Sequence, residues 1–267
     1  MNPTRCNTTN VPTDALARIR IVLSRTSHPG NIGSAARAMK TMGLSRLTLV
    51  RPKIFPDQEA VTLASGATDV LENARVVATL DEALAPVTYS LAVSARARDL
   101  GPASQAARQG AEDLFQRAAA GEEVALVFGN ETSGLSNEDV QRCQGTLHIA
   151  ANPAYSSLNL AAAVQVLAYE LRQAAVQEPP AGAAAGMTVP RKMATPFSSP
   201  PATHAEQEGF YGHLERVMRD SGFLNPERPM RLMPKLRRLF GRARLEKDEV
   251  NILRGILTAV EAATRGK

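Results

Sequence analysis

The sequence predicts an α/β fold, a parallel sheet with helices on both faces, followed by a small all-helical extension. Short apolar runs alternate with helical patterns from residue 19 to residue 172, as in chains that build parallel sheets. The runs are continuously apolar, which is typical of strands buried on both faces. A segment rich in Pro and Ala then separates this region from a more basic one.

We assign the first domain to residues 18–173, after a polar arm at residues 1–17. Its strands are predicted, in chain order, at 19–23, 47–50, 75–77, 89–94, 124–128 and 146–149. Its helices are predicted at 31–42, 102–120, 136–143 and 157–172. A further short helix is predicted to begin with the capping-box pattern at residues 79–82. Asn31, Ser136 and Ser157 are the expected N-caps, because their side chains can accept from the first helical N–H groups.

Residues 174–202 are expected to form a linker, since 6 Pro and 8 Ala fall within these 29 residues. Residues 203–267 predict three helices, at 203–221, 230–240 and 247–263, and the first begins with a capping box at Thr203 and Glu206. A unit this small rarely buries a sufficient core alone. We therefore expect this basic extension to lean on the first domain or on a second subunit.

Composition excludes several classes of protein. The 267 residues are 44% apolar, with no run long enough to span a membrane and no apolar leader in the first 17 residues. Two cysteines form no disulfide framework and fit no metal-ligand spacing, so we expect a cytoplasmic protein without a metal. The net charge of +5 permits an anionic partner. With 4% aromatic residues and no Trp, a binder that stacks many bases is disfavoured.

The candidate functional residues follow predicted strands, where parallel sheets bind ligands. After the first strand, Gly30, Asn31 and Gly33 begin a helix whose N-terminus could hold an anion. Arg37 could reach back to a phosphate held there. A glycine-capped helix with a solvated arginine is the alternative. The loop lacks the Lys of a phosphate-binding loop and the glycine spacing of a dinucleotide binder.

Three further loops follow the fourth, fifth and sixth strands. After the fourth, small residues precede Arg96 and Arg98, which could line a ligand floor or form a surface pair. After the fifth, Glu131 could accept from a ligand hydroxyl, balance an arginine, or be a solvated acid in a turn. After the sixth, Ser157 and Asn159 precede an apolar helix. We expect three of the four loops to converge at one edge of the sheet.

The segment from Arg228 to Lys247 is strongly basic. It holds eight basic residues against Glu246 alone, a net charge of +7. A segment with such an excess of positive charge is suited to bind a nucleic-acid phosphate backbone. The alternative is a helix face that is simply solvated. The residues predicted to bind RNA are Arg231, Lys235, Arg237, Arg238, Arg242 and Arg244.

Taken together, these residues resemble the SPOUT superfamily of knotted methyltransferases, and within it the TrmJ-type tRNA 2′-O-methyltransferases. Residues 27–33 with Arg37 resemble the first motif, 128–135 the second and 152–160 the third. Residues 235–240 and 251–257 are similar to the C-terminal extension of that subfamily. The resemblance covers nearly the whole chain, and three motifs in order are far more specific than one.

The resemblance implies a C-terminal trefoil knot, bound S-adenosylmethionine, and a homodimer with the active site at the subunit interface. The implied substrate is the ribose 2′-hydroxyl of nucleotide 32, cytidine or uridine, in the tRNA anticodon loop. The implied catalytic residues are Asn31, Arg37, Glu131, Ser157 and Asn159. The implied cofactor-binding residues are Ser94, Ala95, Gly129, Ile149 and Leu158.

The family's proposal makes Arg37 the base, but guanidinium groups stay protonated in proteins. We therefore assign Arg37 to clamp a phosphate and orient the hydroxyl. Ser157 and Asn159 would position the ribose, and Glu131 would fix Asn31 or Arg37. The alternatives are methylation of another tRNA position or of ribosomal RNA, a non-catalytic RNA-binding module, and a nucleotide-binding α/β protein.

Overall fold

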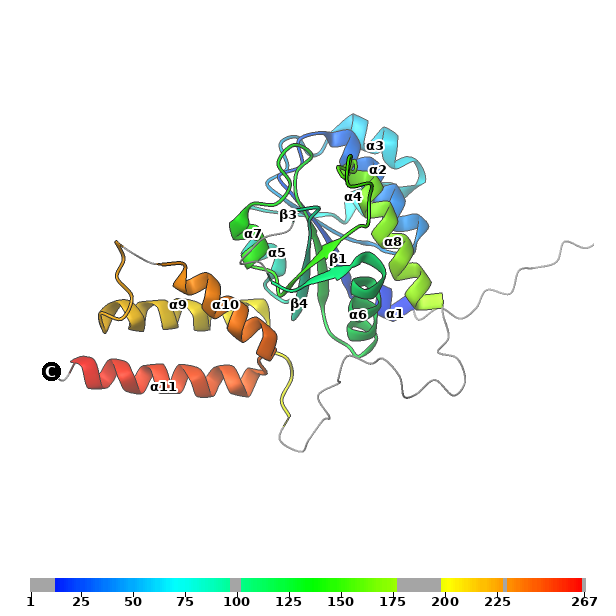
Figure 1. The fold of residues 1–267 in the computed structure, drawn as a ribbon. Coiled ribbons are helices and arrows are strands. Elements are labelled where there is room, and N and C mark those ends of the chain that lie inside the picture. Colours follow the sequence, from blue (N-terminus) through cyan, green and yellow to red (C-terminus); the bar gives the residue numbers. More distant parts are fainter. Residues whose placement is uncertain (1–12, 97–101, 177–197, 228–229, 266–267) are drawn as a thin grey trace, which may run out of the picture.

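The computed structural model describes residues 13–96, 102–176, 198–227 and 230–265, and within these ranges seven strands form one sheet (Figure 1). The strand order is β3-β2-β1-β6-β4-β7-β5, and every neighbouring pair is parallel. All the carboxyl ends therefore meet at one edge, and the predicted parallel sheet is confirmed. The strands are β1 (Ile19–Ser24), β2 (Arg46–Val50), β3 (Arg75–Val77), β4 (Tyr89–Val93), β5 (Ser104–Ala106), β6 (Val124–Phe128) and β7 (Gly145–His148).

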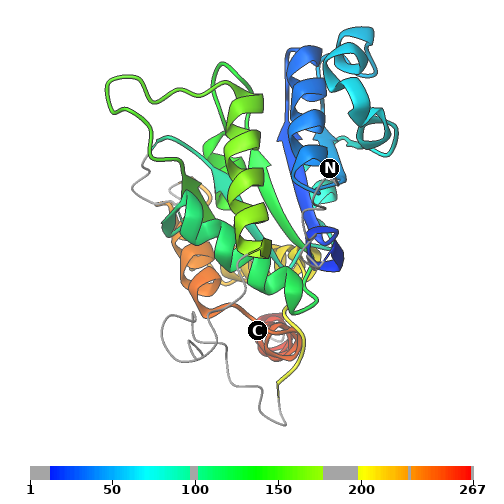
Figure 2. The same cartoon turned by 90° about the vertical axis from the view of Figure 1, so that its right-hand side faces the viewer.

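Helices cover both faces of the sheet. Ile21 of β1 packs into the apolar cluster formed with α2, α6 and α8, whereas Val22 packs into a second cluster with α5 and α7. Figure 2 shows α2, α6 and α8 together on the first face. The helices of this domain are α1 (Thr13–Leu16), α2 (Pro29–Thr41), α3 (Gln58–Ala64), α4 (Thr68–Glu72), α5 (Leu80–Leu84), α6 (Ala107–Ala119), α7 (Asn137–Gln141) and α8 (Leu160–Val176).

The six predicted strands are all present, each within one residue at either end. The prediction of one helix over 102–120 is wrong at its start, because residues 104–106 form β5 and pair with β7 at the sheet edge. These three residues carry no strand pattern, so only pairing with β7 makes them a strand. α3 and α4, for which the sequence predicts nothing, pack beside α2 on one face of the sheet.

Two predicted N-caps are wrong. α2 begins at Pro29, whose fixed φ and missing N–H suit the first helical position. This places Asn31 inside the first turn with its side chain free for other contacts. α8 begins at Leu160, and Asn159 rather than Ser157 caps it. The capping box at Ser136 is present, with Asp139 as its second member.

Parts of the predicted arm and linker are ordered segments. In α1, Leu16 is fully buried against the first domain, because the polar start of the chain ends in an apolar turn. α8 continues to Val176, beyond the expected end of the domain. Pro201 pairs with Glu246, and Ala202 is buried in the core of the extension. The rest of the predicted arm and linker, residues 1–12 and 177–197, lies outside the described residues.

The extension is a three-helix unit of α9 (His204–Asp220), α10 (Leu232–Ala243) and α11 (Lys247–Arg265). Phe210 lies at its centre, edge-on to Phe240 with ring centroids 5.0 Å apart. The start of α9 docks on the first domain, where the His204 N–H donates to the Val87 carbonyl at 2.8 Å. The extension therefore leans on the amino edge of the sheet, opposite the carboxyl ends. Within the described ranges, no helix has the length and apolarity that crossing a membrane requires.

The order of the strands bears on the implied knot. β7 lies between β4 and β5, two strands that precede it in the chain. Such an insertion is compatible with a threaded chain, and β6 is inserted in the same way between β1 and β4. The knot itself stays a prediction.

Candidate active site

Glu131 is the centre of a hydrogen-bonded network at the carboxyl edge of the sheet. Its Oε2 accepts from the Ser27 backbone N–H at 3.0 Å and from the Ser27 hydroxyl at 2.7 Å. Its Oε1 accepts from Asn31 Nδ2 at 2.8 Å and from the His28 N–H at 3.4 Å. An anion does lie at the start of α2, where the helix dipole favours negative charge. That anion is the chain's own carboxylate.

Asn31 joins Glu131 to the loop before α8. Asn159 Nδ2 donates to Asn31 Oδ1 at 3.0 Å. Asn159 Oδ1 in turn accepts from the N–H groups of Ala161 at 2.9 Å and Ala162 at 3.3 Å. Each amide uses both its oxygen and its nitrogen, which fixes the orientation of both side chains. The network thus links residues from all three motif-bearing loops, and their predicted convergence is confirmed.

Glu131 is an anion at neutral pH. Burial raises the pKa of this carboxyl, but hydrogen bonds from Ser27 and Asn31 outweigh burial and lower the pKa to about 2. An ionised carboxylate can only accept hydrogen bonds. Glu131 therefore acts as a fixed acceptor that holds Asn31, and it is poorly suited to take up a proton.

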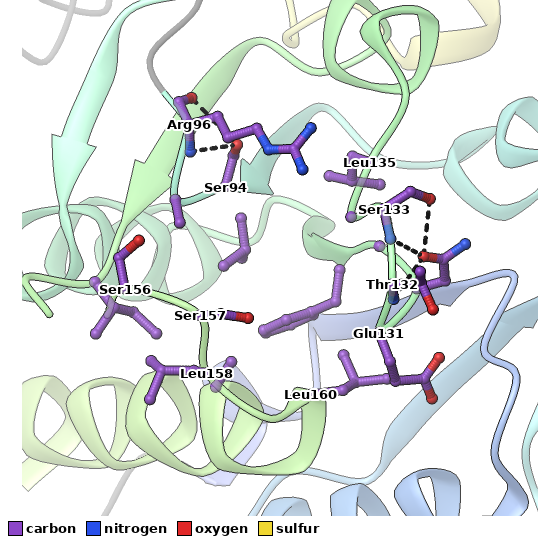
Figure 3. A pocket seen from close by; sticks show the side chains of 18 residues that line it. Ser94, Arg96, Glu131, Thr132, Ser133, Leu135, Ser156, Ser157, Leu158 and Leu160 are labelled. Carbon is purple, nitrogen blue, oxygen red and sulfur yellow. Dashed lines mark hydrogen bonds between the residues drawn. The ribbon is translucent and has the colours of Figure 1, made fainter. Parts of the chain in front are cut away.

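A cavity of about 350 Å³ adjoins this network (Figure 3). Its walls come from the ends of β4 and β7, the loop after β6 and the start of α8 with the loop before it. This volume lies within the range of small-molecule sites. Ser157 and Glu131 line it, and so do all five predicted cofactor-binding residues: Ser94, Ala95, Gly129, Ile149 and Leu158.

The loop after β6 is closed so tightly that it positions Glu131. Asn130 Oδ1 accepts from the Thr132 N–H at 3.1 Å and from the Ser133 N–H and hydroxyl at 2.7 and 2.9 Å. A Cβ on Gly129 would lie 2.1 Å from the carbonyl carbon of Gly134. Only glycine at position 129 lets the two ends of this loop approach so closely.

Arg37 does not join the network. It is exposed on α2, six residues beyond Asn31, which places the two side chains on different faces of the helix. Across the described ranges its side chain has no hydrogen bond or ion pair, and it does not line the cavity. The expected return of its guanidinium to the start of α2 is not seen, since Glu131 already occupies that position.

Gly33 of the first motif is needed for helix packing, whereas the sequence analysis expected it to let the backbone approach a ligand. A Cβ on Gly33 would lie 2.0 Å from the carbonyl oxygen of Ala60 in α3. The predicted close approach of the backbone is therefore made to a neighbouring helix. This contact fixes α3 against α2 behind the site.

The basic residues near α10 fall into two groups. Arg237 donates to both carboxylate oxygens of Glu208, to Oε2 at 2.7 Å, and lies 4.3 Å from the centroid of the Tyr211 ring. Arg237 is thus ion-paired within the extension, and its contact with RNA stays a prediction. Arg244 ends α10 in the left-handed conformation and is exposed, as are four residues at helical spacing: Arg231, Lys235, Arg238 and Arg242. Arg228 and Arg98 lie outside the described residues.

Ser27 belongs to the first motif, but the sequence analysis gave its side chain no role. It supplies two of the four hydrogen bonds to Glu131, yet it is 104 residues away along the chain. A serine in a polar loop carries no distinguishing pattern. Only the position of the first motif beside the loop after β6 gives it a role.

Comparison with known proteins places the chain in a family. The SpoU rRNA methylase family matches residues 18–169, and the C-terminal domain of the tRNA methyltransferase TrmJ matches residues 205–267. The two matches cover the sheet domain and the helical extension separately. They fall on either side of the segment predicted to be the linker.

Relatives of similar length support the same placement. The tRNA (cytidine/uridine/adenosine-2′-O-)-methyltransferase TrmJ of Pseudomonas aeruginosa is 51% identical over 256 residues, covering 94% of this chain and 96% of the relative. TrmJ of Salmonella typhimurium, a tRNA (cytidine/uridine-2′-O-)-methyltransferase, is 49% identical over 253 residues, or 94% and 100% of the two chains. The crystal structure of TrmJ from Z. mobilis has a TM-score of 0.76 at 33% identity, covering 91% and 98%. The chain therefore belongs to the SpoU methylase family and, within it, to the TrmJ methyltransferases.

Proposed function

We propose that this chain transfers the methyl group of S-adenosylmethionine to a ribose 2′-hydroxyl of tRNA, at cytidine or uridine 32 of the anticodon loop. The observation that carries the proposal is the network of Glu131, Asn31 and Asn159, which joins three separate loops beside a cavity. The names of the relatives, which are tRNA 2′-O-methyltransferases, support the substrate class. The resemblance described above supports the nucleotide position.

The cavity fits an adenosyl cofactor in its chemistry. Apolar side chains such as Leu135, Ile149 and Leu158 can cover the faces of a base, and Ser94 and Ser157 offer hydroxyls. S-adenosylmethionine, when bound, supplies an activated methyl group, so the protein mainly has to align the acceptor. The residues that line the cavity would hold it there.

The exposed polar side chains beside the cavity are suited to position a ribose. The Ser157 hydroxyl is exposed and faces the cavity edge. Asn159 still has one amide hydrogen beyond its bond to Asn31. Because the pKa of Glu131 is about 2, this carboxylate holds the amides in place rather than receiving the hydroxyl proton.

We assign Arg37 to clamp an RNA phosphate and so orient the 2′-hydroxyl. It is exposed and carries an unpaired charge in the part of the chain that is described, but it lies on a different helix face from Asn31. That placement supports a site completed by a second copy, in which Arg37 of one chain serves the cavity of its partner. The implied homodimer would meet this requirement.

We assign the exposed basic face of α10 to the tRNA backbone. Its spacing puts Lys235, Arg238 and Arg242 on one side of the helix. Each phosphate that such a face neutralises releases counterions, which makes binding depend on salt. The extension would thereby hold the body of the tRNA.

The decisive experiment is methyl transfer from labelled S-adenosylmethionine to bulk tRNA of a strain that lacks this protein, followed by mapping of 2′-O-methylation. We expect a signal at nucleotide 32. A signal at another nucleotide keeps the enzyme class and rejects the position. No transfer to tRNA, with the cofactor still bound, redirects the search to ribosomal RNA. If the chain does not bind the cofactor, the remaining alternative is a non-catalytic RNA-binding module.

A mixing experiment tests the shared site. Arg37→Ala and Ser157→Ala chains, each inactive alone, are unfolded, mixed and refolded together. If each site takes Arg37 and Ser157 from different chains, the mixed dimers contain one intact site, and roughly a quarter of full activity returns. No recovery in a sample of proven mixed dimers would place both residues in one chain.

A further inference from the structure

Arg96 is a basic residue that takes no part in the network around Glu131. Among the described residues that line the cavity it is the one cation. Ser94 holds its backbone, because the Ser94 hydroxyl accepts from the Arg96 N–H at 3.2 Å and donates to the Arg96 carbonyl at 3.3 Å. Figure 3 shows the guanidinium extending across the cavity from the end of β4 toward Leu135.

The guanidinium of Arg96 is available to a ligand. No hydrogen bond or ion pair is found for it within the described ranges. The carboxylate of Glu131, on another wall, has its oxygens filled by Ser27 and Asn31. An arginine presents five N–H donors in a planar fork, which matches a carboxylate or a phosphate.

We propose that Arg96 binds the carboxylate of the amino-acid group of the cofactor. The inference rests on the proposed function, since S-adenosylmethionine carries one such carboxylate. A carboxylate that leaves water needs a charged or hydrogen-bonding partner. The rest of the described lining offers hydroxyls, backbone groups, apolar side chains, the neutral amide of Asn130 and the negative Glu131, so Arg96 is the cation that can pair with it.

The position of Arg96 favours the cofactor over an RNA phosphate. It shares a short turn with Ser94 and Ala95, two of the predicted cofactor-binding residues. Its side chain lies over the cavity itself. Arg37 and the exposed face of α10, by contrast, lie outside the cavity lining, where a polynucleotide can reach them.

The test compares two ligands by calorimetry on the full chain. S-adenosylhomocysteine carries the amino-acid group, whereas 5′-methylthioadenosine keeps the adenosine and the sulfur without it. We expect Arg96→Gln to weaken S-adenosylhomocysteine about tenfold or more, or about 1.4 kcal/mol, and to leave 5′-methylthioadenosine unchanged. Arg96→Lys should recover part of the loss. Arg75→Gln, which removes the same charge from an exposed residue of β3 outside the cavity, should change neither affinity.

Three results would overturn the proposal. Equal weakening of both ligands would mean that Arg96 only shapes the turn. Unchanged affinity for S-adenosylhomocysteine with weaker tRNA binding would assign Arg96 to a phosphate. If the unaltered chain binds neither ligand, the cofactor assignment itself fails, a result distinct from the other two. Arg96 is exposed, so its variants should keep the thermal midpoint of the unaltered chain.

Discussion

The two edges of the sheet carry polar networks of opposite construction. At the carboxyl edge, one carboxylate, Glu131, is surrounded by neutral donors and keeps its charge. At the amino edge, where the extension docks, Arg142 donates to Asp81 at 2.6 Å and to Glu208 at 3.1 Å. Asp81 also bonds His204, at 2.8 Å. We call this second group of residues, together with Arg237, the docking network.

This difference in charge balance indicates that the two edges of the sheet have different roles. In the docking network every charge faces an opposite one, so these side chains join α5, α7, α9 and α10 and have little left to offer a ligand. The hydrogen bond from His204 is the largest cause of a lowered pKa at Asp81, against the effect of burial. The network around Glu131 instead keeps a net negative charge beside a cavity. Charge balance therefore distinguishes the candidate site from a structural junction.

The largest expected effect comes from Arg37, which belongs to neither network. We predict that Arg37→Ala lowers methyl transfer by roughly a hundredfold or more, as the loss of a transition-state contact does. The thermal midpoint and the affinity for S-adenosylhomocysteine should stay unchanged, because this side chain has no partner among the described residues. Single-turnover kinetics and calorimetry measure the two effects. A variant with near-normal rates would remove Arg37 from the catalytic set.

Breaking the docking network should lower the free energy of unfolding more than it lowers the rate of methyl transfer. Arg142→Ala leaves Asp81 and Glu208 facing each other, and we predict a loss of about 1–3 kcal/mol in the free energy of unfolding. Urea denaturation measures this loss. Arg108→Ala is the control, since the Arg108 side chain is 70% exposed in its pair with Glu170, and ion pairs made by exposed side chains contribute little to stability. Equal losses in the two variants would contradict the distinction between the edges.

The pH dependence of stability tests the charge on Glu131. The pKa is lowered from 4.5 to about 2 on folding, so the ionised carboxylate stabilises the fold above pH 4.5. That contribution is lost as the pH falls through 2. We predict that the unaltered chain is more stable than Glu131→Gln at pH 7, and that the gap narrows between about pH 5 and pH 2. Urea denaturation at pH 7, 5 and 3 follows the gap. A gap that does not change with pH would mean that charge plays no part.

The smallest effect separates two adjacent arginines of α10. Arg238→Gln, on the exposed face, should reduce the slope of log affinity for tRNA against log salt by about 1, with stability unchanged. Arg237→Gln removes one of the two arginine partners of Glu208 and should lower the thermal midpoint instead. Salt titrations of tRNA binding and thermal melts distinguish the two. Identical behaviour of the two variants would make the whole helix either structural or RNA-binding.

Local patterns predicted most of the fold. The apolar runs that became β1 and β6 are buried on both sides, so hydrophobicity alone located them. β5 was not predicted, because its three residues form a strand only through pairing with β7. The start of α2 was misplaced by two residues because Pro29 is a better first residue than Asn31 is a cap.

The sequence predicted where the site lies, but it did not predict which side chains hydrogen-bond to one another there. Parallel strands bring the loops after them to one edge, so the meeting of the three motifs followed from the strand order. Which donor faces Glu131 depends on side-chain positions about a hundred residues apart in the chain. The sequence analysis left Asn31 and Arg37 open as its partner, and Asn31 is the one in contact.

The insertion of β7 between β4 and β5 has a consequence for synthesis. β5 leaves the ribosome before β7, the strand it pairs with in the described sheet. Pairings between segments distant in sequence form late in folding. Ile149 and Leu158, which line the cavity, lie just after β7. A nascent chain therefore has no complete cavity until its last strand is in place, and binding of an adenosyl ligand can serve as a reporter of finished folding.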